Sequence, residues 1–504
     1  MILMTLAESK PYLKEREPFN GVIADMHFNR GTNGVATQMD EMDSWLANNG
    51  ITVIRCAGNV NSPLEYCIPE LSYQSPEAEI LRSKMFPREK EEIERIRNLS
   101  LEQRKAKSSV YLEEIDWRAA IIKEKVGNMI NNYGIGAVHV RNIMSLPLNL
   151  AATYAMYQLA QERDDIRFIF HHHDLPWEGP VSESYGTPYE SINERMEEII
   201  CPDLPNVSHI VINPVAQESL KEKKGIEAHL IPDGLNFEYD FLQVMEEKKF
   251  RRKFGIDEND LVLGMMTRVV LNKNIEGAIQ FARTLEDEIY RQLKSESESA
   301  DAFIQLARAR RRFGPKNKVI LLLTQNADRI SEYHERLIRY AKELGVKLID
   351  ISGDVVADPE YKAGDNKIPF QSVHRYLDLD CYPTEHEGFG NQLPEAVRAM
   401  VPIAMLRYPV AARYIAPEKP DKDHPSFLPH YISLGNMENL HHGEGAYGLN
   451  CLDDNVVLEA ARKTIEELSD SDKLELDLLE NFAAMRGLCD IRNTGPKYLE
   501  IYKS

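Results

Sequence analysis

The chain has 504 residues, 43% of them hydrophobic, and a formal net charge of −20. This length exceeds what one hydrophobic core supports, so it predicts two domains of ordinary size, and the negative charge excludes nucleic acid as a favoured partner. No stretch approaches the roughly 20 apolar residues of a membrane span, and the six cysteines form no C-x-x-C pair. We therefore expect a cytoplasmic protein with reduced thiols and no stable membrane insertion.

The first half of the chain predicts a parallel α/β domain. Its opening places a glycine-containing loop and a helix between two apolar strands, which is typical of such a fold. Residues from about 64 to 131 are dense in charged helix formers and predict a helical insertion, interpreted as a solvated cover without a ligand role. We expect this domain to span 1–235. Apolar runs that predict its strands lie at 21–26, 51–56, 137–140, 167–170, 209–213 and 228–232.

The second half restarts the same pattern after a charged helical stretch. Its domain is expected to span 236–470, and residues 471–504 predict a helical segment that crosses back to the N-terminal domain. A charged segment at 286–318 is interpreted as a second insertion, with the arginine-rich stretch 308–312 on a solvated helix face. Apolar runs that predict strands lie at 261–265, 319–323, 347–351, 379–382 and 403–406.

The segment 383–396 carries the strongest functional pattern in the chain. It follows an apolar strand and enters a helix, and Gly388 and Gly390 allow close approach of a ligand to the backbone. Free amides at a helix start attract phosphate or sugar oxygens. Glu387 and Glu395 flank this entrance, and ionised carboxylates accept hydrogen bonds from ligand hydroxyls. A capped helix with ordinary surface acids is the less favoured interpretation, because these features coincide.

Two basic residues follow the first strand of the second half. Arg268 and Lys273 at a strand end supply the local positive charge that a bound diphosphate requires. Such a pair alone is as consistent with ordinary solvent-exposed side chains as with a phosphate-binding role. Its place about 115 residues before the acidic segment favours a shared anion-binding site.

Three consecutive histidines, 171–173, end the strand at 167–170 and precede Asp174. Adjacent side chains on a strand point to opposite faces, so the three cannot easily chelate one ion. We therefore predict no metal site here. Packing of a strand end remains an alternative to a role in binding.

The acidic segment resembles the E-x7-E motif of the retaining family-4 glycosyltransferases, which have the GT-B fold of two Rossmann-like domains facing a cleft. The resemblance implies that Glu387 holds hydroxyls of the donor sugar and Glu395 the ribose diol. Asn391-Gln392 departs from the small or aliphatic residues that many members carry. The amides implied to face the sugar and diphosphate belong to Gly388, Phe389, Gly390 and Asn391.

Arg268 and Lys273 resemble the Arg-x4-Lys motif of the same family. The resemblance implies that they bind the donor phosphates and neutralise the departing nucleotide. Family members also carry a histidine at the end of an N-domain strand, near the donor sugar. Either His172 or His173 fits this role, and we favour His172 with Asp174 beside it.

The other N-domain assignments rest on position within the same family pattern. The first glycine loop, which includes Gly34, is implied to approach either the donor phosphates across the cleft or the acceptor. Arg141 and Asn142 follow a strand and are expected, with His173, to line the acceptor pocket.

The resemblance implies a retaining hexosyltransferase that uses a UDP-, GDP- or ADP-hexose and requires no cofactor or metal. The acceptor is expected to be a glycan or a small polar molecule, such as a sugar or a glycerate derivative, and homo-oligomer formation stays open. A GT-B disaccharide phosphorylase and a non-catalytic sugar-nucleotide-binding scaffold remain as alternatives, whereas an epimerase is disfavoured because no matching carboxylate and histidine set is present.

Overall fold

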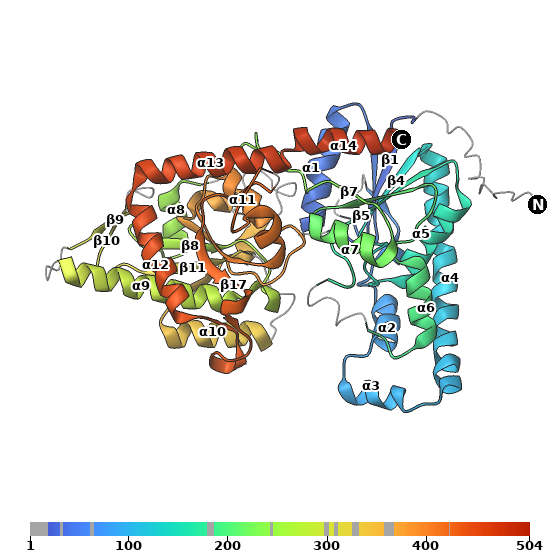
Figure 1. Ribbon diagram of the computed structural model, residues 1–504, viewed down its shortest axis with the longest axis horizontal. Coiled ribbons are helices and arrows are strands. Elements are labelled where there is room, and N and C mark those ends of the chain that lie inside the picture. The colour runs from blue at the N-terminus through green and yellow to red at the C-terminus, as the bar shows by residue number, and fades with distance from the viewer. Residues whose placement is uncertain are drawn as a thin grey trace, which may run out of the picture.

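The computed structural model has an α/β architecture in which two parallel sheets form separate halves joined by long C-terminal helices (Figure 1). Each half has a continuous apolar core on both faces of its sheet. The residues described are 19–30, 34–60, 65–178, 186–241, 245–296, 302–306, 311–324, 332–356, 367–422 and 424–504.

The N-terminal half contains a seven-stranded parallel sheet in the order β3-β2-β1-β4-β5-β6-β7. All six predicted strands are present, and β3 is an addition too short to be visible in the sequence. The strands are β1 (Val22–His27), β2 (Thr52–Ala57), β3 (Tyr66–Cys67), β4 (Ala137–Arg141), β5 (Arg167–His172), β6 (Val207–Val211) and β7 (His229–Leu230).

Strand β5 shows how the sequence divides between the two faces of this sheet. Phe168 and Phe170 pack in the core beneath the insertion, whereas Ile169 packs in the core on the opposite face. This alternation follows from the two-residue period of a strand. The same alternation determines which face of the sheet each of the histidines at the end of the strand points to.

Helices cover both faces of this sheet. The predicted insertion is mainly helical, and its long helix α4 begins at a Ser100 and Gln103 capping box and ends at Gly134, which has a left-handed φ of 61°. The helices are α1 (Gly34–Asn48), α2 (Pro76–Met85), α3 (Lys90–Arg97), α4 (Leu101–Tyr133), α5 (Leu150–Glu162), α6 (Glu190–Ile199) and α7 (Pro214–Lys224).

The C-terminal half contains a six-stranded parallel sheet in the order β12-β11-β8-β15-β16-β17. Its five predicted strands are present, and β17 is an edge strand that the sequence did not predict. The sheet consists of β8 (Leu261–Met265), β11 (Val319–Leu323), β12 (Lys347–Asp350), β15 (Leu379–Tyr382), β16 (Ile403–Arg407) and β17 (Ile432–Asn436).

Short strand pairs and helices complete this half. Short pairs form between β9 (Ile304–Leu306) and β10 (Arg311–Phe313), β13 (Val355–Val356) and β14 (Ile368–Pro369), and β18 (Leu440–His441) and β19 (Cys451–Leu452). The helices are α8 (Glu247–Lys253), α9 (Ile275–Glu296), α10 (Glu332–Leu344), α11 (Gln392–Arg398), α12 (Asp454–Ser469), α13 (Ser471–Cys489) and α14 (Ile491–Lys503).

The prediction of a solvated helix face at 308–312 is wrong where the structure describes this stretch. Residues 308–310 lie outside the described residues. Arg311 begins the hairpin strand β10 and is buried. Its guanidinium lies 3.1 Å from Asp378 and 2.5 Å from Glu247. The buried Asp378 and the exposed Glu247 therefore determine the position of this arginine, and neither acid is near it in the sequence.

The C-terminal helices span both halves of the molecule (Figure 1). Helix α13 packs on α11 of the second half, and α14 packs on α1 and β5 of the first. The exact domain limits at 235 and 470 stay a prediction. Among the residues described, no helix combines the length and apolar character needed to cross a bilayer.

Candidate active site

The structure brings together the two motifs of the second half that the sequence places 115 residues apart. Strands β8 and β15 are neighbours in the sheet, so the loops after them lie side by side at its C-terminal edge. Lys273 and Glu387 form an ion pair, and Asn272 donates to the carbonyl oxygen of His386 at 3.3 Å. The backbone amide of Glu385 donates to Asn272 at 2.9 Å. A basic loop and an acidic loop thus form one surface.

The two glycines of the acidic loop lie where no side chain fits. A Cβ at Gly388 would overlap the carbonyl oxygen of His173, across the boundary between the halves. Gly390 has a φ of 90°, and a Cβ there would overlap the hydroxyl of Tyr408, which donates to the Phe389 carbonyl at 2.5 Å. The Phe389 side chain is buried, so this residue presents only its backbone to the loop surface.

Arg268 and Lys273 differ in their exposure. Arg268 is exposed, whereas Lys273 is buried and directs its ammonium to Glu387. An exposed guanidinium beside a buried ammonium gives the loop surface two positive groups at its edge. An anion entering beside them would be held by charge-assisted hydrogen bonds.

Glu395 lies in α11 and is buried, as is Gln371, whose side-chain amide donates to it at 2.8 Å. Burial raises the pKa of Glu395 to about 7, and the charges of His374 and Arg398 together with the Gln371 hydrogen bond oppose that shift. A carboxyl group with this pKa is close to half ionised at neutral pH. It can therefore accept hydroxyl groups of a ligand and release its proton as it does so.

The opposite wall of the site is the end of β5. Of the two histidines considered for the cleft, His173 carries the carbonyl that contacts Gly388, whereas His172 points into the N-terminal core and bonds to His209 at 2.9 Å. Asp174 is half-buried. Its negative charge opposes the lowering of the His386 pKa by burial, which places Asp174 near the acidic loop.

Asn142 and Arg141 have partners within the N-terminal half. Asn142 has a left-handed φ of 59°, accepts the His173 amide at 2.8 Å and donates to Asp174 at 3.3 Å. Arg141 is completely buried and forms a bidentate pair with Asp25 at 2.8 Å. Asn142 thus positions the end of β5, and the acceptor role of both residues stays a prediction.

Gly34 starts α1 and faces the second half. A Cβ on it would lie 3.3 Å from the side-chain nitrogen of Asn391, so the N-terminus of α1 approaches the acidic loop closely. A hollow between the halves is lined by Glu41, Asp233, Asn391 and Glu395 among others. Residues 31–33 of the first loop lie outside the described residues.

Asn213 is a site residue that the sequence analysis missed. Its side-chain nitrogen donates to the carbonyl oxygen of Gly388 at 2.6 Å, and its side-chain oxygen caps α7 by accepting the Ala216 amide at 2.8 Å. The Asn-Pro pair at 213–214 is a helix-start signal and indicates the cap. Only the fold reveals the second contact.

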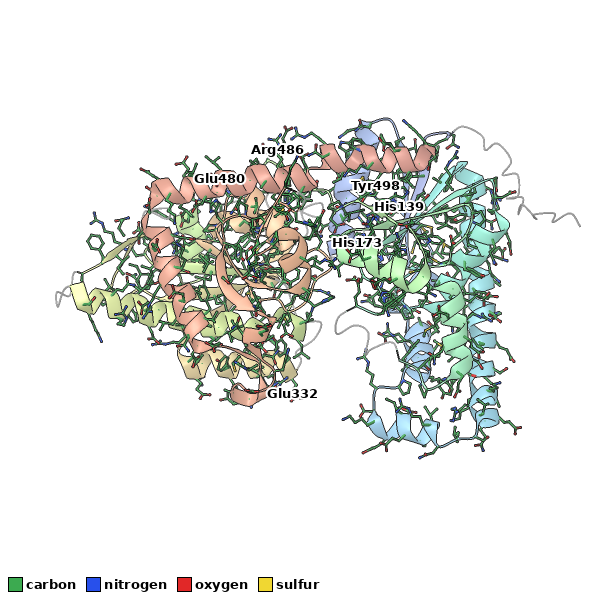
Figure 2. All side chains as sticks on the ribbon, viewed as in Figure 1. His139, His173, Glu332, Glu480, Arg486 and Tyr498 are labelled. Carbon is green, nitrogen blue, oxygen red and sulfur yellow. The ribbon has the colours of Figure 1, made fainter. Side chains whose placement is uncertain are left out.

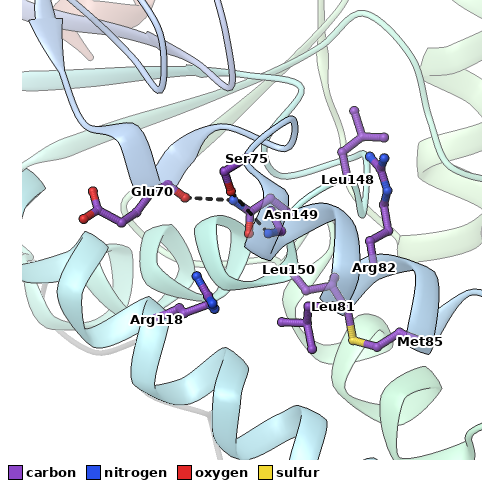
Figure 3. A pocket seen from close by; sticks show the side chains of 10 residues that line it. Glu70, Ser75, Leu81, Arg82, Met85, Arg118, Leu148, Asn149 and Leu150 are labelled. Carbon is purple, nitrogen blue, oxygen red and sulfur yellow. Dashed lines mark hydrogen bonds between the residues drawn. The ribbon is translucent and has the colours of Figure 1, made fainter.

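A second hollow lies in the insertion, between α2, α4 and the start of α5 (Figure 3). Asn149 donates to the Glu70 carbonyl at 2.9 Å and caps α5, and Arg118 pairs with Glu114 at 2.7 Å. These polar groups stabilise the fold of the insertion. The hollow contains none of the predicted site residues.

Comparisons with known proteins identify chains of similar sequence. No protein-family model matches the chain. The mannosylglucosylglycerate synthase of Petrotoga mobilis is 28% identical over 397 residues, which cover 78% of this chain and 84% of the relative. The enzyme of the same name from Thermotoga maritima is 25% identical over 455 residues, which cover 89% of this chain and 90% of the relative.

Solved structures with low identity share the fold. Sucrose-phosphate synthase from Thermosynechococcus elongatus superposes with a TM-score of 0.58 at 12% identity, covering 95% of this chain and 98% of that one. The catalytic domain of starch synthase IV from Arabidopsis thaliana, bound to ADP and acarbose, gives 0.53 at 11% identity, covering 95% and 98%. The fold is therefore GT-B. The two sequence relatives, which match most of the chain, support glycosyltransferase activity.

Proposed function

We propose that this enzyme transfers a hexose from a nucleotide sugar to a hydroxyl group of a glycerate-containing acceptor, with retention of anomeric configuration. The name shared by the two relatives describes a product made of mannose, glucose and glycerate. The proposed reaction is accordingly transfer of mannose to glucosylglycerate. Its donor is a UDP-, GDP- or ADP-linked hexose.

The observation that carries the proposal is the contact between the two loops of the second half. Lys273 and Glu387 touch, so a positive group and a carboxylate lie within one ligand's reach. A nucleotide sugar joins a diphosphate, which needs cations, directly to a sugar, which offers hydroxyls to carboxylates. The diphosphate would lie beside Lys273 and the adjoining sugar beside Glu387, so the neighbouring groups of the ligand match the neighbouring side chains.

Each residue of the donor site has a role in this proposal. Arg268 and Lys273 bind the diphosphate, and Glu387 exchanges its contact with Lys273 for hydroxyls of the sugar. Glu395 accepts the ribose diol. The backbone amides that face the sugar and the diphosphate belong to Gly388, Phe389, Gly390 and Asn391.

The N-terminal wall completes the site. His173 and Asp174, at the end of β5, lie against the acidic loop and face the donor sugar, with Asn142 fixing their backbone. Gly34 keeps the start of α1 close to Asn391 and to the donor phosphates. We favour His173 as the histidine of the cleft, because its backbone contacts Gly388 whereas the His172 ring is turned to His209 in the N-terminal core.

The proposed chemistry proceeds on one face of the sugar. The bond between the anomeric carbon and the phosphate oxygen breaks while the acceptor oxygen attacks from the same side. The acceptor's proton passes to the departing phosphate oxygen, and Arg268 and Lys273 stabilise the charge that develops there. Closure of the two halves expels water that would hydrolyse the donor.

A two-stage experiment tests this function. A thermal-shift panel of UDP-, GDP- and ADP-hexoses identifies the donor, because a ligand at 100 times its Kd stabilises the native state by about 2.7 kcal/mol. Transfer to glucosylglycerate is then followed by NMR, and the anomeric coupling of the product reports retention. Cleavage of the glycoside by inorganic phosphate, or its formation from a sugar 1-phosphate and the acceptor, with no nucleotide sugar present would overturn the proposal in favour of a phosphorylase.

A further inference from the structure

The three consecutive histidines of the chain divide between two environments. The rings of His171 and His173 share one face of the sheet and stack with their centroids 4.2 Å apart. His172 points to the other face and bonds to His209. Two imidazoles therefore lie side by side, which the alternation along a strand permits for residues two apart.

A carboxylate from a distant segment joins this pair. Asp233 follows β7, and its Oδ1 lies 3.3 Å from Nδ1 of His173. One ligand atom from each of His171, His173 and Asp233 lies within 4.8 Å of the others, and all three residues are buried. Two histidines and one carboxylate form a ligand set typical of divalent transition metals.

Each of the three residues has a buried polar atom without a hydrogen-bond partner among the described residues. These atoms are Nε2 of His171, Nε2 of His173 and Oδ1 of Asp233. Leaving a buried donor or acceptor unsatisfied costs about 1–3 kcal/mol. Three such atoms in one cluster indicate a ligand that satisfies them together.

A chain of hydrogen bonds orients the first imidazole. Tyr502 of α14 contacts Nδ1 of His139 at 2.7 Å, and Nε2 of His139 contacts Nδ1 of His171 at 3.1 Å. Figure 2 shows His139, His173 and Tyr498 gathered in the N-terminal half near α14. Such outer contacts fix the orientation of metal-binding histidines, and here they leave Nε2 of His171 free to bind.

The protonation and charge of the cluster also suit a cation. Burial lowers the pKa of His171 well below its usual value, and the nearby Arg141 guanidinium acts in the same direction. A neutral imidazole is the form that binds metal. The charge of Arg141 is balanced by its bidentate pair with Asp25, so Asp233 stays available to the ion.

We propose that His171, His173 and Asp233 bind one divalent transition-metal ion, with Zn²⁺ as the best match to two imidazoles and a carboxylate. Zinc lies about 2.0–2.2 Å from such ligands, so binding requires side-chain rotations that draw the ligand atoms together by about 1 Å. Water completes the coordination.

The position of Asp233 indicates what the ion would do. Asp233 lies in the segment that leads from β7 into the second half, and the next residues pair with the junction of α13 and α14 through Leu235 and Asp490. An ion shared with β5 would fasten this connector to the N-terminal sheet. We assign the ion a structural role. Its ligand His173 also lies in the proposed donor site, so the test measures metal binding directly and does not use sugar transfer as its readout.

The test uses the untagged full-length protein after removal of metal with a chelator. Wild type is expected to take up one tight equivalent of Zn²⁺ in a calorimetric titration and to gain thermal stability. With Co²⁺ it is expected to show the d–d absorption bands of nitrogen and oxygen ligation. Failure of wild type to bind either ion at 100 µM, a concentration about 100 times a micromolar Kd, would overturn the proposal.

Two variants assign the ligands. Asp233→Asn is expected to raise the Kd for Zn²⁺ at least about tenfold, whereas the matched His172→Asn, on the other face of the same strand, is expected to keep the single site. Near-ultraviolet circular dichroism checks the folding of both variants. Wild-type affinity in Asp233→Asn refutes the assignment, and the wild-type titration decides the proposal even if a variant fails to fold.

Discussion

At the scale of single residues, Glu387 is more exposed than its ion-pair partner in the donor site proposed here. Its carboxylate is 25% exposed, while its partner Lys273 is 9% exposed, so the acid stands nearer to an incoming ligand. Charge-assisted hydrogen bonds that a carboxylate accepts from sugar hydroxyls discriminate sugars from other ligands. In the proposed site, Glu387 would therefore bind and orient the sugar.

Replacement of Glu387 by alanine is expected to lower kcat/KM for the nucleotide sugar by about 10- to 100-fold, since hydrogen bonds to a charged group contribute about 1.5–3 kcal/mol. The measurement is steady-state transfer with varied donor. Glu332→Ala is the matched control, because Glu332 is an exposed acid at the start of α10. Equal activity of the Glu387 variant and the control would contradict the assignment of the motif.

Glu395 gives the site a pH dependence. Burial raises its pKa to about 7, so below that pH the carboxyl is protonated and loses acceptor capacity for the ribose hydroxyls. Loss of the carboxylate is expected to raise the Kd for the nucleotide sugar as the pH falls from 8 to 6, with a limiting slope of about tenfold per pH unit. Burial also lowers the pKa of Lys273 to about 7, so protonation of that amine offsets part of the rise by strengthening diphosphate binding. Isothermal titration across this range measures the change.

Glu395→Gln is the control for that titration. The amide does not ionise, so the variant is expected to bind the donor weakly at every pH between 6 and 8. A pH profile of the variant that is parallel to that of wild type would assign the titration to another group.

The sequence predicts which residues belong to the site better than it predicts which side chains contact one another. Glu387 and Lys273 belong to motifs with recognisable order, and the structure brings them into contact. The faces of the histidines were also inferable from strand alternation. The third member of that cluster, Asp233, was not, because its neighbour His173 lies 60 positions earlier and only the fold joins them.

At the scale of elements, the acidic loop depends on the absence of a side chain at Gly388. Replacement by alanine would place a Cβ against the His173 carbonyl and within 3.3 Å of Ile212. Because backbone atoms cannot rotate away, the loop must shift. We expect Gly388→Ala to weaken donor binding at least about tenfold, as a displacement of about 1 Å in an active site does, measured by titration with the nucleotide sugar.

Gly127 provides a matched control for that substitution. It lies inside α4, and a Cβ there meets no atom within 4 Å. Gly127→Ala is expected to leave donor binding unchanged and to raise stability by about 0.5–1 kcal/mol, because alanine favours the helix. Loss of donor affinity in both variants would show that Gly388 has no special position.

Secondary structure was predictable where the chain forms buried strands. Apolar runs such as 319–323 have no polar alternation and became central strands of the second sheet. The edge strand β17 was missed because exposed and buried residues mix in it. Arg311 was assigned to a solvated helix because its buried partner Asp378 comes from a neighbouring layer that the sequence does not reveal.

At the scale of the whole molecule, few polar contacts hold the two halves together near the site. Asn213 reaches from the start of α7 to the Gly388 carbonyl and is buried, whereas Arg413 and Glu218 form an ion pair with both side chains 53% exposed. An exposed pair contributes about 0–1 kcal/mol. The buried Asn213 contact should therefore contribute more to the coupling between the two halves than the exposed ion pair does.

Asn213→Asp separates that coupling from helix capping. The carboxylate can still accept the Ala216 amide and cap α7, but it cannot donate to the Gly388 carbonyl, which it would instead repel. We expect kcat/KM for donor transfer to fall about tenfold or more, since a buried carbonyl without its donor costs about 1–3 kcal/mol. Arg413→Ala, which removes the exposed contact between the same halves, is expected to keep wild-type kinetics. The opposite ranking of the two variants would place the coupling at the molecular surface, away from the acidic loop.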